Sequence, residues 1–427
     1  MKVLVTGASG LIGGSIVARL AADGHEIVAA VRDAGAPLPL AVSAVVVLDM
    51  AQAGADDWAG HLAGIEAVVN CVGVLQDSPR EDVAVHARGA AALFEACARL
   101  GIRRVIHFSA IGVDRGAVSR FSESKYEGDQ ALMALDLDWV ILRPSVVLGR
   151  PVFGASALFR GLAALPRLPL MGDTGELQVV QLNDVTDTVA LFLTPGAPSR
   201  VALELAGPER LSMADIVALY RRWLGWPPAR SIRLPGPVES LLYKLGDMVG
   251  QLGWRPPMRT TVRKEILRGA VGSPAQWTEI TGIAPQSLST ALTRMPATVQ
   301  ERWFAKLYFL KALTFIVLSM FWLGTGIISL TVGYEIGEDL MHRTGAGALA
   351  GPSVIAGALA DIVVGLMLVY RPYARAGLYG AIFLSLFYAT AGTILLPELW
   401  AEPLGPLLKI WPILVLHFIA LATLDER

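Results

Sequence analysis

The sequence predicts an α/β fold, a doubly wound parallel sheet with a small second lobe, followed by a bundle of four membrane-spanning helices. Three observations lead to this prediction. The chain opens on a short apolar strand, a glycine-rich turn and a helix. Apolar runs then alternate with helical stretches, which is typical of a parallel sheet covered by helices. The C-terminal part holds four apolar stretches of about the 20 residues that a bilayer-spanning helix needs.

Length and composition set the broad class. The 427 residues allow two or three domains, and we expect these to be residues 1–150, 151–300 and 301–427. The chain is 54% hydrophobic with a mean hydropathy of +0.52, too apolar for an ordinary soluble protein. The net charge of -1 gives no basic excess that would indicate nucleic acid. Two cysteines form neither a metal-ligand spacing nor a disulfide framework, so we expect a reducing compartment and no metal site.

The opening strand (residues 2–6) and helix (11–22) flank a G-x-x-G-x-x-G turn. Its first glycine permits the tight turn, its second lets the backbone approach a pyrophosphate, and its third lets the helix pack on the sheet. The helix N-terminus adds unpaired N–H groups and a positive dipole end. We therefore expect a dinucleotide here, with a purely structural turn as the alternative. The residues expected at the pyrophosphate are Gly7, Ser9, Gly10, Leu11, Ile12 and Gly13.

Arg32 and Asp33 follow the second predicted strand, about twenty residues after the glycine turn, where the adenosine ribose is recognised. An acidic residue there would bind the 2′-hydroxyl of NAD, whereas an arginine would accommodate the 2′-phosphate of NADP. Because Arg32 comes first, NADP is favoured, with NAD as the alternative. A solvated charge pair at a strand end is the other interpretation.

Further candidates stand at the ends of predicted strands, where ligands bind in such sheets. The predicted strands cover residues 26–31, 45–48, 66–70, 103–108 and 139–142, with a long helix at 82–100. The candidates selected by this position are Asp49, Asn70, Gly73 and Ser109.

Several motifs together resemble the atypical short-chain dehydrogenases/reductases, in the group that contains the mitochondrial complex I accessory subunit and NmrA-like proteins. They are TGASGLIGG, NCVG, FSAIGVD, FSESK, LRPSVVLG and LQVVQLNDVTDTVA, within about residues 1–215. The resemblance implies a Rossmann domain that binds NAD(P). The apolar C-terminal part, with its RWFAKLYFLK lead-in, resembles the DoxX-like membrane domains that occur fused to such domains in bacteria.

The chain departs from the resembled family at the catalytic position. That family places a tyrosine four residues before a lysine, with a serine upstream. Lys125 matches the lysine and Ser109 the serine, but Phe121 occupies the tyrosine position. The resemblance implies that Lys125 holds the nicotinamide ribose, while the missing general acid is worth about 10²- to 10⁴-fold in rate. Tyr126 lies roughly 140° around the helix from position 121 and is a poor replacement; Ser109 has a simple strand-end role as its alternative.

Residues 151–300 contain predicted helices at 213–223 and 237–252. Apolar residues recur at helical spacing in the second helix, namely Val238, Leu241, Leu242, Leu245 and Val249. Such a face either packs on the body of the protein, which we favour, or lies on a membrane surface.

The predicted spans are residues 313–332, 347–370, 377–396 and 406–424. Basic and acidic loops alternate between them, and the positive-inside rule then places both termini in the cytoplasm. Together with the DoxX-like resemblance, this implies a multi-pass protein of the bacterial inner membrane. Asp361 and His417 are ionisable residues inside two spans. Such residues indicate function by default, and we expect the two to face each other. The alternative is a structural hydrogen bond to a neighbouring helix.

Three functions agree with these patterns. The first is a membrane-anchored NAD(P)H-dependent oxidoreductase acting on a lipophilic substrate such as a quinone. The second, favoured by Phe121, is a non-catalytic nucleotide-binding redox sensor or structural subunit of a membrane complex. The third, motivated by Asp361 and His417, is a regulated transporter-like bundle. A dinucleotide, the bilayer and, for the first function, a lipophilic small molecule are the expected partners, and the sequence leaves a protein partner open.

Overall fold

The computed structural model describes residues 1–75, 82–116, 118–172 and 174–425. The chain divides into two units. The first, here called the nucleotide unit, comprises Met1–Asp247 and Pro256–Ala305. The second, the membrane unit, comprises Met248–Arg255 and Lys306–Arg427. The membrane unit therefore includes a short segment from the middle of the chain, far from the apolar C-terminal stretches.

The nucleotide unit is built on a seven-stranded sheet whose strand pairs are all parallel, in the order β10-β6-β5-β4-β1-β2-β3. The strands are β1 (Lys2–Thr6), β2 (Glu26–Val31), β3 (Ala44–Val47), β4 (Ala67–Asn70), β5 (Arg104–Phe108), β6 (Asp138–Pro144) and β10 (Val201–Leu205). The order reverses between β1 and β4, and doubly wound sheets bind ligands at the carboxyl ends of the strands at such a switch point. The predicted doubly wound sheet is confirmed. β10, at the sheet edge, was not predicted.

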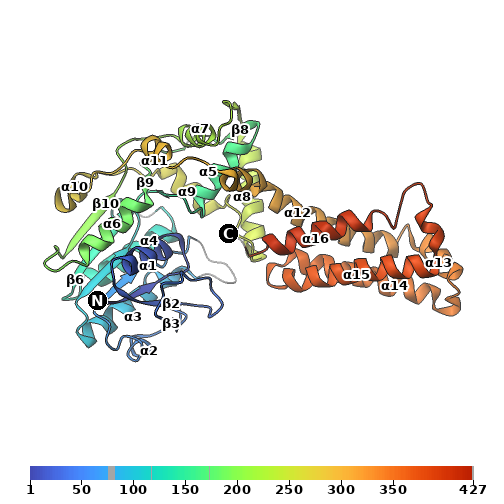
Figure 1. Ribbon diagram of the computed structural model, residues 1–427, viewed down its shortest axis with the longest axis horizontal. Coiled ribbons are helices and arrows are strands. Elements are labelled where there is room, and N and C mark those ends of the chain that lie inside the picture. The colour runs from blue at the N-terminus through green and yellow to red at the C-terminus, as the bar shows by residue number, and fades with distance from the viewer. Residues whose placement is uncertain (76–81, 117, 173, 426–427) are drawn as a thin grey trace. The chain divides into compact units, whose positions relative to one another are not determined.

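Helices cover both faces of this sheet (Figure 1). α1 (Leu11–Ala22), α6 (Leu182–Phe192) and α10 (Ala275–Thr281) contribute to the apolar core on one face. The core on the other face includes side chains of α2 (Ala55–Trp58), α3 (Arg88–Leu100) and α4 (Arg120–Met133). The amphipathic pattern explains these positions. In α1, for example, Gly13, Ile16, Val17 and Leu20 are buried, a spacing that places them on one side of the helix.

The predicted continuous helix at 82–100 is wrong. The structure has a short 3₁₀ helix, η1 (Val83–Val85), and then α3. His86 lies at the break, and its ring accepts a hydrogen bond from the Val74 backbone N–H at 2.8 Å. A Cβ atom on Gly89 would lie 2.3 Å from the Met50 carbonyl oxygen. These tertiary contacts fix where α3 begins.

The remaining elements of the nucleotide unit form the second lobe and its connections. Two small parallel sheets pair β8 with β11 and β7 with β9. These elements are η2 (Val113–Arg115), β7 (Val147–Leu148), α5 (Ala155–Ala164), β8 (Arg167–Leu170), β9 (Val180–Gln181), α7 (Met213–Trp223), β11 (Arg230–Arg233), α8 (Gly236–Gln251), α9 (Thr260–Arg268) and α11 (Leu288–Arg294).

The membrane unit is helical. Three helical segments of the described chain are long and apolar enough to cross a bilayer: Val299–Leu330, Gly347–Val369 and Arg371–Leu395. The elements are α12 (Val299–Leu330), α13 (Tyr334–Arg343), η3 (Gly347–Leu349), α14 (Ala350–Val369), η4 (Arg371–Tyr373), α15 (Ala374–Leu395), η5 (Pro397–Trp400) and α16 (Ile410–Thr423). The fourth predicted span, 406–424, forms the 14-residue α16, which is apolar but shorter. It begins only after the turns around Gly405 and Pro406.

Glycines let the apolar helices approach closely, as expected of membrane helices. A Cβ on Gly326 of α12 would lie 2.6 Å from the Ala358 carbonyl oxygen of α14. A Cβ on Gly365 of α14 would lie 2.7 Å from the Leu323 side chain of α12. The two helices therefore pack through reciprocal glycine contacts.

Asp361 and His417 are both buried in the membrane unit, but each binds an aromatic residue. The Tyr388 hydroxyl donates to Asp361 Oδ1 at 2.8 Å, and the Trp322 indole N–H donates to His417 Nε2 at 2.9 Å. The expectation is that Asp361 and His417 face each other, but no hydrogen bond or ion pair joins them among the described residues. Tyr388 on α15 and Trp322 on α12 bind them separately, and His417 Nδ1 is buried without a hydrogen-bond partner among the described residues.

Candidate functional site

The glycine turn has the geometry that its sequence predicts. Gly7 adopts a φ of +65°, and a Cβ there would lie 3.0 Å from the Cys71 backbone. A Cβ on Gly13 would lie 2.2 Å from the Gly7 carbonyl oxygen, so only glycine lets α1 pack this closely on the turn. Gly10 is the N-cap of α1, and its N–H donates to the Gly7 carbonyl at 2.9 Å. Contacts between backbone atoms alone therefore keep this turn narrow. Residues 7–13 are called the glycine corner below.

This corner can accept a pyrophosphate. No side chain caps the N-terminus of α1, so the first N–H groups of the helix, at Leu11 and Ile12, have no intrahelical acceptor. Ser9 lies half-buried beside them. Unpaired N–H groups and the positive end of the helix dipole favour a bound anion at this position.

The charged candidates beyond β2 and β3 lie at exposed positions. Arg32 directly follows the end of β2. The Asp33 carboxylate accepts the Gly35 backbone N–H at 2.9 Å, and the Asp49 carboxylate accepts that of Ala51 at 3.1 Å. Both acids thus shape their own turns. The role of Arg32 at the adenosine ribose and that of Asp49 as a strand-end cofactor ligand remain predictions.

A buried network of hydrogen-bonded polar side chains crosses the carboxyl ends of the central strands. The Thr6 hydroxyl donates to Asn70 Oδ1 at 2.7 Å, and the Asn70 amide lies 3.1 Å from His107 Nδ1. His107 Nε2 in turn lies 3.6 Å from Asp129 Oδ1. Arg143 is the last member of this network and donates to Asp129 Oδ2 at 3.0 Å. The Asn70 side chain is therefore held by protein partners, and its role as a cofactor ligand stays a prediction.

Burial shifts the pKa values of two groups in this network, Asp129 and His107. Desolvation raises the pKa of Asp129, and the Arg143 guanidinium opposes that rise. Desolvation, together with the charge of Lys125, holds the pKa of His107 well below 6.5. His107 is consequently neutral at pH 7 and can accept from Asn70 while its other ring nitrogen faces Asp129.

Lys125 projects from α4 and is almost fully buried. Its ammonium donates to the Phe108 carbonyl at 2.7 Å and to the Val72 carbonyl at 2.9 Å. Burial lowers the pKa of Lys125 to about 8, while the nearby Asp129 favours the charged form. Because an ammonium has three protons, two carbonyls leave one proton for a ligand.

Phe121 lies four residues before Lys125 on α4, in the tyrosine position of the resembled family. Its ring packs edge-to-face with His86, with ring centroids 5.6 Å apart. His86 is held by Val74 and by Ser124, whose hydroxyl lies 3.0 Å from Nδ1. Burial keeps the pKa of His86 well below 6.5, so it is not an acid at pH 7. Neither Phe121 nor the His86 ring that contacts it can therefore act as the general acid at this position.

Ser109 and Tyr126 differ in their surroundings. The Ser109 hydroxyl is buried, and no described residue meets the geometry of a hydrogen bond to it. It is nevertheless close enough to Asp129 to lower the pKa of that carboxyl group. Tyr126 is 37% exposed and replaces nothing in the site. Ser109 thus shares the strand-end region with Lys125, as predicted from its position.

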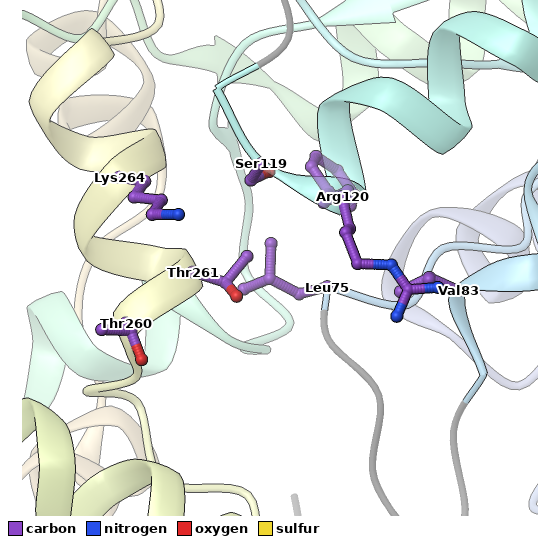
Figure 2. A pocket seen from close by; sticks show the side chains of 8 residues that line it. Leu75, Val83, Ser119, Arg120, Thr260, Thr261 and Lys264 are labelled. Carbon is purple, nitrogen blue, oxygen red and sulfur yellow. The ribbon is translucent and has the colours of Figure 1, made fainter.

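A cavity of about 340 Å³ opens beside Phe121 (Figure 2), a volume within the usual range for small-molecule sites. In Figure 2 Lys264 and Thr261 of α9 face Leu75 and Arg120 across it. Among the residues that the structure describes, those that line this cavity include no acidic side chain. The lining residues are Leu75, Val83, Ser119, Arg120, Phe121, Thr260, Thr261 and Lys264.

α9 is fastened to the start of α4. Glu265 Oε1 accepts hydrogen bonds from the Ser119 and Ser122 hydroxyls, both at 2.5 Å. Arg268 forms an ion pair with Glu265 at 2.7 Å and donates to the Ile111 carbonyl. The wall of the cavity that α9 forms is therefore held by charge-assisted hydrogen bonds.

The structure brings the glycine turn, Asn70, Gly73, Ser109 and Lys125 to the carboxyl ends of adjacent strands. Sequence reasoning did not identify four polar residues that organise this region: His86, His107, Asp129 and Glu265. For Asp129 a signal exists, because it stands one helical turn after Lys125 on the same face of α4. Glu265 lies more than 140 residues from Ser119, and only the folded chain pairs them.

The strand order and the glycine corner define an NAD(P)-binding Rossmann domain. In agreement, residues 7–158 match the NAD(P)H-binding family, and residues 319–418 match the DoxX-like family. The chain belongs to the atypical short-chain dehydrogenases/reductases and carries a C-terminal DoxX-like domain.

Three curated relatives illustrate this membership. The mitochondrial NADH-ubiquinone oxidoreductase 40 kDa subunit of Neurospora crassa is 24% identical over 67% of this chain and 76% of its own length. The ceramide reductase of Caulobacter vibrioides is 27% identical over 55% of this chain and 74% of its own length. The 3-diazoavenalumate denitrifying reductase of a Streptomyces species is 40% identical over 54% of this chain and 84% of its own length.

Solved structures support the fold. MoeE5 in complex with UDP-glucuronic acid and NAD superimposes with a TM-score of 0.53 and 20% sequence identity. The match covers 69% of this chain and 97% of that chain. At this identity the likeness establishes the fold of the nucleotide unit alone.

Proposed function

We propose that the chain is a membrane-anchored, NAD(P)H-dependent oxidoreductase that acts on a lipophilic substrate such as a quinone. The membrane is the bacterial inner membrane, with the nucleotide unit and both termini in the cytoplasm. One observation carries the proposal. The same chain contains a glycine corner that can accept a pyrophosphate and helices that are long and apolar enough to cross a bilayer. A bilayer anchor keeps an active site where a lipophilic substrate partitions.

The cofactor is proposed to lie along the carboxyl ends of β1, β2 and β4, with NADP preferred through Arg32. The glycine corner fits a pyrophosphate, because its two close approaches involve only backbone. Lys125 has one proton left for a ribose hydroxyl after binding two carbonyls. A bound NAD(P)H would supply a hydride, and a quinone that takes this hydride plus one proton becomes a quinol.

Phe121 decides which substrates suit the site. It cannot donate a proton, so reduction of an ordinary carbonyl lacks its usual acid. A quinone depends less on that acid, because its reduced oxygens can take protons from water. The relative named ceramide reductase gives independent support for a lipophilic substrate.

The second candidate is a non-catalytic NAD(P)(H)-binding sensor or a structural subunit of a membrane complex. Phe121 favours it, since cofactor binding survives the loss of the acid. A relative named as a subunit of an NADH-ubiquinone oxidoreductase also favours it.

Oxidation of NADPH by a panel of quinones and aldehydes, with the full-length protein in lipid nanodiscs, separates the two candidates. We expect quinone-dependent NADPH oxidation and little aldehyde reduction in the natural protein. The Phe121→Tyr variant restores the missing acid and should raise aldehyde or ketone reduction by about 10²- to 10⁴-fold.

Tyr126→Phe is the matched control, because this exposed hydroxyl on the same helix should not affect either reaction. Saturable NADPH binding without turnover by any quinone would favour the sensor or structural role. A natural protein that reduces aldehydes as fast as the Phe121→Tyr variant would contradict the role given to position 121.

A further inference from the structure

α8 exposes an apolar face. Val238, Leu241, Leu245 and Met248 are 43%, 56%, 42% and 54% exposed. Their spacing of three and four residues places them on one side of the helix. The expectation favoured from sequence is that the apolar residues pack on the body of the protein. It is wrong for Val238, Leu241 and Leu245, whereas Leu242 and Val249 are half-buried. The buried side of α8 contains Glu239, Tyr243, Gly246 and Gly250 instead.

The opposite face of α8 is fixed by the segment that leads into α9. A Cβ on Gly246 would lie 1.6 Å from the Met258 carbonyl oxygen, so the two backbones are in close contact. The Arg263 guanidinium lies 5.6 Å from the centre of the Tyr243 ring and 3.7 Å from the Glu239 carboxylate. α8 therefore cannot rotate its apolar face inward without breaking these contacts.

The C-terminal end of α8 and the loop after it, Met248–Arg255, belong to the membrane unit. The Trp254 indole N–H donates to the Val369 carbonyl at the end of α14, at 2.8 Å. The Arg371 backbone N–H donates to the Leu252 carbonyl at 3.0 Å. The loop that follows the exposed apolar face is thus hydrogen-bonded to the end of α14, a helix long and apolar enough to cross a bilayer.

Charge around α8 suits an anionic surface. Residues 228–268 contain eight basic and three acidic residues, although the whole chain has a net charge of -1. Lys244 is an exposed charge on α8 itself. Each basic residue near an anionic leaflet contributes about 1 kcal/mol of attraction, which adds to burial of the apolar face.

We propose that α8 is a membrane-surface helix: its apolar face enters the headgroup region of the leaflet that borders the α14–α15 loop. Amphipathic helices of this kind insert by about 5–10 Å. The occupant of the face is therefore lipid. This docking does not depend on the reaction proposed for the nucleotide unit.

A depth measurement on the full-length protein tests the proposal. Leu241→Cys is labelled with the fluorophore NBD in a background where Cys71 and Cys97 are alanine, with Leu245→Cys as a second position on the same face. The protein is placed, one copy per disc, in nanodiscs of phosphatidylethanolamine and phosphatidylglycerol. Leu100→Cys is the matched control, an exposed leucine at the end of α3.

We expect blue-shifted emission at both α8 positions and several-fold stronger quenching by lipid carrying a spin label near the headgroup than at position 100. Iodide in the water should quench position 100 more strongly. Equal iodide quenching at positions 241, 245 and 100 would overturn the proposal. So would protection that appears only in discs with two copies, since a second copy of the chain would then cover the face.

Discussion

Two side chains one helical turn apart on α4 set the chemistry of the candidate site. Lys125 is held between the Phe108 and Val72 carbonyls at the strand ends. Phe121, which lines the cavity, offers no proton. The site thus retains the residue that would hold a ribose and lacks the residue that would complete carbonyl reduction. If the chain binds a cofactor and turns over a substrate as proposed, single substitutions should therefore separate the two.

The pKa of Lys125 predicts a pH dependence of cofactor binding. As the pH rises through about 8, the ammonium loses the one proton that the two carbonyls leave available. The dissociation constant for NADPH should then rise by roughly ten-fold, the worth of one hydrogen bond from a charged donor. Isothermal titration from pH 6.5 to 9.5 measures it.

Lys125→Met supplies the control for that pH series. It should bind NADPH weakly at all pH values, without a transition near pH 8. A natural protein with the same flat profile would contradict the assignment of Lys125. Because its folded pKa lies below the ordinary 10.5, Lys125 lowers the free energy of unfolding below pH 8, and this cost is relieved as the pH rises from about 8 to 10.5.

At the scale of elements, α1 and its turn depend on backbone contact. The G-x-x-G-x-x-G spacing predicted β1, α1 and β2 at their observed bounds, because glycine positions and apolar periodicity are local signals. Other elements depend on partners distant in sequence. α9 is placed by Glu265 and Arg268, and α3 begins where Gly89 meets Met50. No local pattern encodes those contacts.

Gly13→Ala tests whether the close packing of α1 on the glycine turn is needed for stability and for NADPH binding. The added Cβ would lie 2.2 Å from the Gly7 carbonyl oxygen, and overpacking of this kind costs about 1–3 kcal/mol. We expect a lower unfolding temperature and a loss of NADPH affinity, measured by thermal unfolding and by titration.

Gly60→Ala is the matched control for that substitution. Position 60 has no atom within 4 Å of an added Cβ and no left-handed backbone, so it should change neither property. Unchanged NADPH binding by Gly13→Ala would mean that the corner does not hold the cofactor.

At the scale of the whole molecule, the sequence predicts a nucleotide-binding sheet followed by apolar helices, and both are present. What it could not predict is which polar groups the membrane unit pairs. Asp361 and His417 looked like partners because both are ionisable and lie in apolar helices. In the structure, Tyr388 and Trp322 bind them separately. Side-chain pairing between helices depends on their rotation, which hydropathy does not report.

Tyr388→Phe should destabilise the membrane unit, because it removes the hydrogen bond to a buried carboxyl group. An unsatisfied buried group costs about 1–3 kcal/mol. The unfolding midpoint of the full-length protein in detergent should fall. Tyr379→Phe, at an exposed position on the same helix, should leave it unchanged. Equal midpoints for the two variants would show that the Tyr388 hydroxyl contributes no stability.

The central claim is that the glycine corner binds a dinucleotide. Its most direct test is a titration of the full-length protein in nanodiscs with NADPH and NADH, followed by fluorescence or calorimetry. We predict saturable binding of one dinucleotide per chain, tighter for NADPH, with the preference lost in Arg32→Ala. Absence of saturable binding for both dinucleotides would contradict the account.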